Sequence, residues 1–282
     1  MTRLFGVMGH PVTHSLSPVM HTAAFRALRL DALYAPFDVP PRVLKPILRA
    51  LILAGVEGMS VTVPLKERVV PLMDRLEGSA RAIGAVNTIV VRRRRLIGYN
   101  TDGPGIVLAL RELGWRAGPT RAVVLGAGGA ARAVAWELMR APGSVVTIAN
   151  RRVARGRRLA RWLSRACPRS RAHARALREV TLAEVELLVN ATTVGMQAQD
   201  GLLIDPTRLH RGLLVYDLVY HRQTALVEAA RRRGCVAANG MSMLLYQGAE
   251  ALRLWLGRPA PLAPMRRALE RSLQRRSIVH GQ

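Results

Sequence analysis

Short apolar runs alternate with segments of helical periodicity along most of the chain. Runs rich in Val, Ile and Leu predict strands, and apolar residues that recur every three or four positions predict helices. Expected strands lie at 4–9, 32–39, 58–63, within a hairpin over 85–101, and at 122–125, 144–150, 183–192 and 212–220. Expected helices lie at 17–30, 41–53, from about 66, at 101–114, within 126–141 and from 240 to the end. Such alternation is typical of an α/β fold with parallel sheets covered on both faces.

The pattern restarts once and later loses its strands, which predicts how the chain is divided. A glycine-bearing helix that starts near Asp102 joins the first series of strands and helices to a second series. From Gly240 onward the chain is helical. We therefore expect three segments, 1–102, 103–239 and 240–282, with the boundaries at these two residues.

Composition allows two hydrophobic cores, and the strong positive charge does not by itself indicate a partner. Half of the 282 residues are hydrophobic, and the formal net charge is +25. The arginines occur in separate runs at 92–95, 151–178 and 231–233, without interleaved aromatic residues or a known nucleic-acid-binding motif. We expect no specific nucleic-acid partner.

Cysteine and histidine usage favours a reduced, metal-free protein. Cys167 and Cys235 have no CxxC spacing and cannot form a disulfide framework. His10, His14 and His21 lie close in sequence but have no HExxH pattern or cysteine companion, so no metal site is expected. The N-terminal apolar run is broken by Gly and Pro, and no uncharged segment approaches membrane length, which predicts a cytoplasmic protein without a membrane partner.

A glycine turn follows the strand at 122–125 and opens the next helix, in the stretch GAGGAARA. Gly126 ends the strand, Gly128 lets the backbone approach a pyrophosphate, and Ala131 supplies the small residue that close helix packing requires. The helix directs its N-terminus at the phosphates. The strand, turn and helix together predict dinucleotide binding.

The following strand ends without the acid that usually binds the ribose hydroxyls of NAD. Asn150 stands there, Arg151 and Arg152 come next, and Arg155 follows one turn later. Guanidinium groups would instead pair with a 2′-phosphate, which favours NADP. The alternative is that these arginines belong to a solvated, arginine-rich helix face.

Hydroxyl, amide and charged side chains gather at strand ends in the first hundred residues, where open α/β sheets place ligands. Each of them alone is an ordinary turn or cap residue. They are Ser15, Ser17, Thr62, Lys66, Asn87, Asn100, Thr101 and Asp102. Lys66 and Lys45 are the only lysines among 43 basic residues, and lysine, unlike arginine, can exchange a proton.

Nine stretches that contain these residues resemble the shikimate dehydrogenase family and cover residues 4 to about 256. They are GHPVTHSLSP, VTVPLKE, GAVNT, GYNTDG, GAGGAARA, ANRR, NATTVGM, YDLVY and NGMSMLLYQGAEAL. The resemblance implies an N-terminal α/β substrate domain, completed by C-terminal helices, and a Rossmann dinucleotide-binding domain. It also implies the reversible, NADP-dependent interconversion of 3-dehydroshikimate and shikimate in aromatic amino acid biosynthesis.

The resemblance also implies residue roles, with Lys66 and Asp102 as the catalytic pair. The implied substrate contacts are Ser15, Ser17, Thr62, Lys66, Asn87, Asp102, Tyr220 and Gln247. The implied NADP contacts are Gly126, Ala127, Gly128, Gly129, Ala130, Asn150, Arg151, Arg155, Thr192, Met196 and Gly240. A monomer and a homodimer both remain open.

Two positions depart from the family pattern. The family usually has Asn at the position of Ser60 and Gly at the position of Ser242, so the departures bear on substrate affinity rather than on reaction type. One alternative is a quinate or quinate/shikimate dehydrogenase that uses NAD or NADP. Another is a non-catalytic NADPH-binding sensor, against which the intact Lys66 and Asp102 pair argues.

Overall fold

The computed structural model describes residues 2–280, with side chains as far as Arg275, and divides into two compact units. The first unit comprises Met1–Gly105 and Leu244–Gln282, and the second comprises Ile106–Met243. The first unit is therefore built from two separate pieces of chain. The sequence-based boundaries, after Asp102 and at Gly240, stay a prediction.

The first unit holds a six-stranded mixed sheet in the order β2-β1-β3-β5-β6-β4. Its strands are β1 (Arg3–Gly9), β2 (Ala32–Asp38), β3 (Val56–Val61), β4 (Arg75–Leu76), β5 (Thr88–Arg92) and β6 (Arg95–Tyr99). Its helices are α1 (Ser17–Ala27), α2 (Leu44–Leu53) and α3 (Ser79–Ile83), with short 3-10 turns η1 (Pro41–Val43) and η2 (Val70–Leu72). The hairpin expected over 85–101 forms as β5 and β6, and it makes the sheet mixed, because β5 pairs antiparallel to both β3 and β6.

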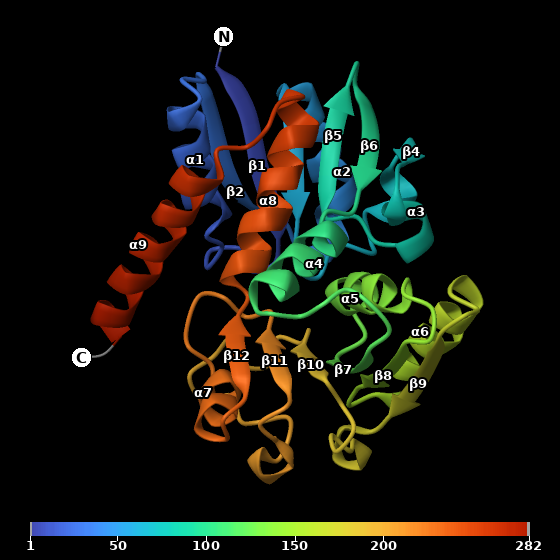
Figure 1. Cartoon of the computed structure of the whole chain (residues 1–282). Helices are drawn as coiled ribbons and strands as arrows, with labels where there is room; N and C mark the ends of the chain where they lie inside the picture. Colours follow the sequence, from blue (N-terminus) through green and yellow to red (C-terminus); the bar gives the residue numbers. More distant parts are fainter. Residues whose placement is uncertain (1, 281–282) are drawn as a thin grey trace. The chain divides into compact units, whose positions relative to one another are not determined.

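Two C-terminal helices, α8 (Met241–Leu256) and α9 (Leu262–His280), complete the first unit (Figure 1). Trp255 on α8 lies against Gly58 of β3 and donates a hydrogen bond from Nε1 to the Ile89 carbonyl at 3.0 Å. Its ring packs 5.3 Å from that of Phe5. The core of this unit therefore depends on residues that lie far apart in the sequence.

The second unit is a wholly parallel sheet in the order β12-β11-β10-β7-β8-β9. The strands are β7 (Arg121–Leu125), β8 (Val145–Ala149), β9 (Arg171–Arg175), β10 (Leu187–Asn190), β11 (Leu214–Asp217) and β12 (Val236–Asn239). The helical segments are α5 (Gly129–Met139), α6 (Val153–Ala166), η3 (Leu177–Glu179), η4 (Pro206–Arg208) and α7 (Ala225–Arg232). Helix α4 (Asp102–Glu112) spans a boundary between the two units. Its residues as far as Gly105 belong to the first unit, and those from Ile106 belong to the second. The predicted α/β class and Rossmann-type second half are confirmed.

The expected helix from about Lys66 does not form. Residues 66–69 make turns, followed only by η2. Pro71 lacks the N–H that an α-helix interior needs, so an α-helix from Lys66 cannot continue through it, whereas the first turn of η2 accommodates it. Lys66 therefore lies on an irregular connection after β3.

Both cysteines are free and buried. Among residues 2–280, no helix has the length and apolar character required to cross a bilayer. Within the same residues, no three His, Cys, Asp or Glu side chains are grouped so that they could hold a metal ion.

Candidate functional site

Lys66 and Asp102 form a nearly buried ion pair in the first unit. Lys66 Nζ lies 2.5 Å from Asp102 Oδ2, and the two side chains are 13% and 4% exposed. The backbone holds the lysine in place, because its carbonyl accepts a hydrogen bond from the Val86 N–H at 2.8 Å. Asp102 begins α4, and Asn100 and Thr101 connect it to the end of β6. The Lys66 side chain is more exposed than that of Asp102, although both are largely buried.

Asn87 connects this pair to α8. Its Nδ2 lies 2.9 Å from Asp102 Oδ1 and 3.3 Å from Gln247 Oε1. Gln247 is placed there by a close approach of α4 and α8, where a side chain on Gly105 would meet the Gln247 backbone. The Asn87 amide therefore donates a hydrogen bond to Oδ1 of Asp102, and Lys66 contacts the other carboxylate oxygen, Oδ2.

Two buried threonines fix the orientation of Asn87. The Thr101 N–H donates to Asn87 Oδ1 at 2.7 Å, and the Thr101 hydroxyl lies 2.9 Å from Asn87 Nδ2. Thr88 Oγ1 donates to Asn87 Oδ1 at 3.1 Å and also lies 3.0 Å from Thr101 Oγ1. These contacts determine which face of the amide donates and which accepts. The sequence indicated Thr101 as one of the polar residues at strand ends, but its contact with Asn87 was not predicted. Thr88 and Gly105 were not among the candidate residues.

Ser15 and Ser17 lie at the start of α1. Ser17 is the first residue of the helix, and Ser15 Oγ accepts the Ser17 N–H at 3.3 Å. No protein partner is recorded for the Ser17 hydroxyl within the described part of the chain. Thr62 follows β3, and its N–H donates to the Met8 carbonyl at 2.8 Å. The first unit therefore contains Ser15, Ser17, Thr62, Lys66, Asn87, Asp102 and Gln247 of the predicted set.

Ser60, one of the two departures from the family pattern, lies in a buried polar contact beside this network. Its hydroxyl accepts a hydrogen bond from the Tyr34 hydroxyl at 2.8 Å. Tyr34 stacks on His21, with ring centroids 4.4 Å apart. His21 is completely buried, and among the described residues neither of its ring nitrogens has a hydrogen-bond partner. Burial lowers its pKa to about 3.

The glycine turn in the second unit has the form that phosphate binding requires. Gly126 has φ of +111°, and its N–H donates to the Ala149 carbonyl at 2.8 Å. A Cβ on Gly128 would meet nothing within 4 Å, so the backbone there faces open space. Helix α5 starts at Gly129, Ala130 follows, and Ala131 is fully buried behind them. The residues present therefore fit a pyrophosphate at the N-terminus of α5.

The end of β8 carries positive charge and no carboxylate. Asn150 Nδ2 donates to the Arg152 carbonyl at 2.9 Å, which shapes the connection into α6. Arg151, Arg152 and Arg155 are exposed there. Their guanidinium groups fit a phosphate on the ribose better than a free diol.

A buried network supports the loops after β10 and β11. Asp217 accepts hydrogen bonds from Asn190 Nδ2 at 2.9 Å and from the Thr224 hydroxyl at 2.8 Å. Burial raises the pKa of Asp217, against the effect of these donors. Asn190 in turn accepts from the Thr192 hydroxyl at 2.8 Å. Sequence reasoning missed Asn190, Asp217 and Thr224, although the first two stand in the quoted stretches NATTVGM and YDLVY.

The remaining predicted residues of the second unit lie on these loops. The Met196 carbonyl accepts from His221 Nε2 at 3.0 Å, next to Tyr220. Gly240 donates its N–H to the Val219 carbonyl at 3.1 Å, and a Cβ there would collide with the Leu218 carbonyl. Ser242, the second departure, lies 2.9 Å from the Tyr216 hydroxyl. Tyr220 thus belongs to a different unit from the other predicted substrate contacts.

Two family models and a curated relative are similar to the chain. Residues 7–89 match the family described as shikimate dehydrogenase substrate binding domain, and residues 240–270 match the shikimate 5'-dehydrogenase C-terminal domain. The chain is 47% identical to the shikimate dehydrogenase (NADP(+)) of Rubrobacter xylanophilus, over 95% of each chain.

Solved structures with the same fold include two kinds of dehydrogenase. Shikimate 5-dehydrogenase from Thermus thermophilus, in complex with NADP(H) and shikimate, is 37% identical, with a TM-score of 0.86 over 96% of this chain and all of that chain. Quinate dehydrogenase from Corynebacterium glutamicum, in complex with NAD, is 31% identical, with a TM-score of 0.85 over 95% of this chain and 98% of that chain.

Proposed function

Because the chain belongs to the shikimate dehydrogenase family, we propose that it interconverts 3-dehydroshikimate and shikimate with NADP as cofactor. The observation that carries this proposal is the 2.5 Å contact between Lys66 Nζ and Asp102 Oδ2, held by Asn87 in a nearly buried polar network. An ammonium group in such a position can supply a proton to an oxygen that develops negative charge.

In the reducing direction, Lys66 donates a proton to the substrate oxygen as it becomes an alkoxide. Asp102 holds the ammonium group toward that oxygen and accepts a hydrogen bond from a neighbouring substrate hydroxyl. The Ser15 and Ser17 hydroxyls bind the substrate carboxylate, and Thr62, Asn87 and Gln247 bind ring hydroxyls. We assign Tyr220 as a further substrate contact.

NADP supplies and accepts the hydride. We propose that the N–H groups at Gly128, Gly129 and Ala130 bind its pyrophosphate, next to Gly126 and Ala127. Asn150, Arg151 and Arg155 bind the adenosine ribose and its 2′-phosphate, and Thr192, Met196 and Gly240 line the nicotinamide side.

Quinate is the second candidate substrate, because a quinate dehydrogenase of similar fold is 31% identical to the chain. The side chains after β8 argue against NAD as its partner, since no carboxylate stands where the ribose diol would bind. This chain has Ser60 where the family usually has Asn, and the Ser60 hydroxyl accepts a hydrogen bond from Tyr34. We expect this difference to alter the affinity of the protein for the ring hydroxyls of the substrate.

Initial rates with shikimate or quinate, each with NADP+ or NAD+, test the proposal through the absorbance of the reduced nicotinamide. We expect the highest kcat/KM with shikimate and NADP+. A higher kcat/KM with quinate than with shikimate would show that the protein is a quinate dehydrogenase instead. Binding of NADPH without turnover of either substrate would instead support a cofactor sensor.

Cellular location and assembly belong to the same proposal. Two free, buried cysteines are compatible with a reducing compartment, and we propose that the enzyme acts in the cytoplasm. We propose a monomer or a homodimer, which sedimentation at two protein concentrations distinguishes.

A further inference from the structure

The loop after β10 lies directly against the glycine turn. A Cβ on Gly126 would stand 3.0 Å from the Ala191 carbonyl oxygen and 3.2 Å from the Thr192 side chain. Strands β8 and β10 are the two neighbours of β7 in the sheet, on opposite sides. With the adenosine half of NADP on the arginines after β8, as proposed above, the nicotinamide half extends to the other side of β7, over the loop after β10.

One buried side chain, that of Asn190, closes this loop. Its Oδ1 accepts hydrogen bonds from the Thr192 N–H at 3.1 Å and from the Thr192 hydroxyl at 2.8 Å. Its Nδ2 donates to the Val194 carbonyl at 3.0 Å, and the Val194 N–H donates to the Thr192 hydroxyl at 3.1 Å. Both ends of the amide therefore hold the backbone between Ala191 and Val194.

Asp217, at the end of β11, fixes the direction in which that amide points. Its Oδ1 accepts hydrogen bonds from Asn190 Nδ2 at 2.9 Å and from the Val219 N–H at 3.0 Å. Its Oδ2 accepts from the hydroxyl of Thr224, the N-cap of α7, at 2.8 Å. An ionised carboxylate can only accept, so a reversed amide would place Oδ1 of Asn190 against it. Because Asp217 is fully buried, such a contact between two acceptors would be costly.

On the basis of the proposed function, we propose that Asn190 and Asp217 are positioning residues for hydride transfer. They hold Thr192 and Met196 in place beside the nicotinamide ring. The two residues are 2% and 0% exposed, so they act through the loop rather than by contact with NADP. Hydride transfer requires two carbon atoms to be close and aligned, and a displacement of about 1 Å can lower the rate about 100-fold.

The test measures the two halves of the cofactor separately. Adenosine 2′,5′-bisphosphate resembles the adenosine half of NADP and lacks the nicotinamide, and calorimetric titration of the full chain measures its affinity. In Asn190→Leu we expect kcat with saturating shikimate and NADP+ to fall about 10- to 100-fold. The affinity for adenosine 2′,5′-bisphosphate should stay within about twofold of that of the parent.

The leucine variant is expected to fold. Three of the four hydrogen bonds recorded for the Asn190 side chain are only partly buried, so water can replace the lost partner in them. Thermal melting checks this expectation. Should Asn190→Leu fail to melt cooperatively, Asn190→Ser, which leaves room for a water molecule beside Asp217, takes its place with the same expected results.

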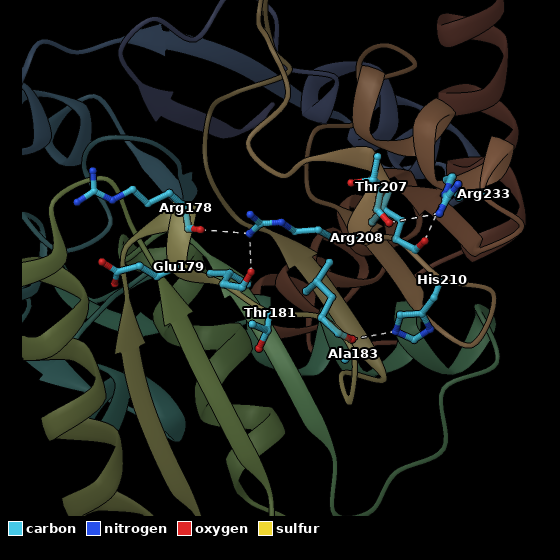
Figure 2. Close-up of a pocket in the computed structure, with 11 residues that line it drawn as sticks. Arg178, Glu179, Thr181, Ala183, Thr207, Arg208, His210 and Arg233 are labelled. Carbon is cyan, nitrogen blue, oxygen red and sulfur yellow. Dashed lines mark hydrogen bonds between the residues drawn. The ribbon is translucent and has the colours of Figure 1, made fainter.

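Arg208→Leu is the matched control, because Arg208 also ties two loops together, at the opposite end of the same sheet. Its Nη1 donates to the carbonyls of Arg178 at 3.2 Å and Val180 at 2.8 Å (Figure 2). These segments precede β10 and β11, whereas Asn190 and Asp217 are the last residues of those strands. The control should keep the kcat of the parent and its affinity for both ligands.

Binding of NADPH distinguishes failure of this proposal from failure of the proposed function. Asn190→Leu should bind NADPH about fivefold more weakly than the parent does, which corresponds to the loss of about one hydrogen bond. A parent protein that turned over neither shikimate nor quinate would refute the proposed function. The affinities of Asn190→Leu for NADPH and for adenosine 2′,5′-bisphosphate would then still decide whether the loop is positioned for the nicotinamide half.

Three results would overturn the proposal. The first is an active parent and an Asn190→Leu variant with nearly the same kcat. The second is equal weakening of NADPH and adenosine 2′,5′-bisphosphate binding, or no weakening of either, in Asn190→Leu. The third is an equal loss of kcat in Arg208→Leu, which would show that any loosened loop of this unit has the same effect.

Discussion

Lys66 occupies a position where the chain's usual basic residue would not serve. Arginine supplies 41 of the 43 basic residues, yet a lysine contacts Asp102. Arginine would keep the charge but could not readily release a proton, and its planar group would displace the donor. We expect Lys66→Arg to lose nearly as much turnover as Lys66→Ala, about 10²- to 10⁴-fold.

The comparison of turnover with shikimate affinity separates a proton donor from a structural charge. Affinity should weaken far less than turnover, because the serine and amide groups would still bind the substrate. Turnover of Lys66→Arg within a few-fold of the parent would refute the acid–base assignment. Thermal melting serves as the control, since breaking a buried ion pair also destabilises the fold.

His21 makes the stability of the first unit sensitive to acid. Its pKa is about 3 in the folded protein, against 6.5 in an unfolded chain, so the unfolded state alone gains a proton as the pH falls below 6.5. Stability should therefore fall between pH 6.5 and 3, by about 2 kcal/mol at pH 5 from this group alone. His21→Phe, which keeps an aromatic ring against Tyr34, should remove that part of the pH dependence.

Denaturant melts at pH 7.5 and pH 5 measure this effect. Trp255 is the only tryptophan in the sequence of the first unit, so its fluorescence can follow that unit, whereas Trp115, Trp136 and Trp162 belong to the second. His21→Leu controls for ring size. An identical loss of stability on acidification in parent and both variants would contradict the prediction.

At the scale of elements, the connection from β8 to α6 should select the cofactor. Replacing Arg151 and Arg155 together by Ser should raise the KM for NADP+ at least about tenfold, because each charge-assisted hydrogen bond contributes about 1.5–3 kcal/mol. Kinetics with NAD+ should change little. Arg157→Ser with Arg161→Ser, two exposed positions on the same helix, is the matched control. Equal losses with both cofactors would mean that Arg151 and Arg155 are structural.

The β5–β6 hairpin contains a backbone arrangement that its residues do not favour. Arg93 and Arg94 form the two-residue turn with φ of +49° and +64°. Asn-Gly is the pair that such turns prefer, so Arg93→Asn with Arg94→Gly should stabilise the first unit by about 1 kcal/mol in denaturant melts. Arg93→Gln with Arg94→Gln removes the same charges but keeps the backbone cost. Equal stabilisation by both pairs would attribute the effect to charge.

Elements with a local sequence signal could be predicted, and those that depend on distant partners could not. The glycine turn and the apolar strands carry their signal within a few residues. Strand β9 reads RAHAR inside an arginine-rich stretch and forms only because β8 pairs with it. The Thr88 and Thr101 contacts with Asn87 likewise require β5 and β6 to lie side by side. The family resemblance was confirmed, while the individual site roles stay predictions.

At the scale of the whole molecule, the first unit is incomplete without the last helices. Ending the chain at Met243 should prevent that unit from folding, because Gly58, Phe5 and Ile89 would lose their contacts with Trp255. We expect rapid proteolysis of residues before 105 in the shortened chain. Limited proteolysis followed by mass spectrometry measures this, with a chain ending at Arg275 as the control. Equal resistance of the two chains would show that α8 is dispensable.

Because the first unit is built from two separate pieces of chain, the order of synthesis determines when its core can form. Residues 1–105 emerge first, but the helices that cover them are translated only after the whole second unit, on the order of ten seconds later. The earliest part of the chain is therefore the last to acquire its native contacts. During that interval Phe5, which packs on Phe25 within the first segment, lacks the Trp255 ring that covers it in the complete protein.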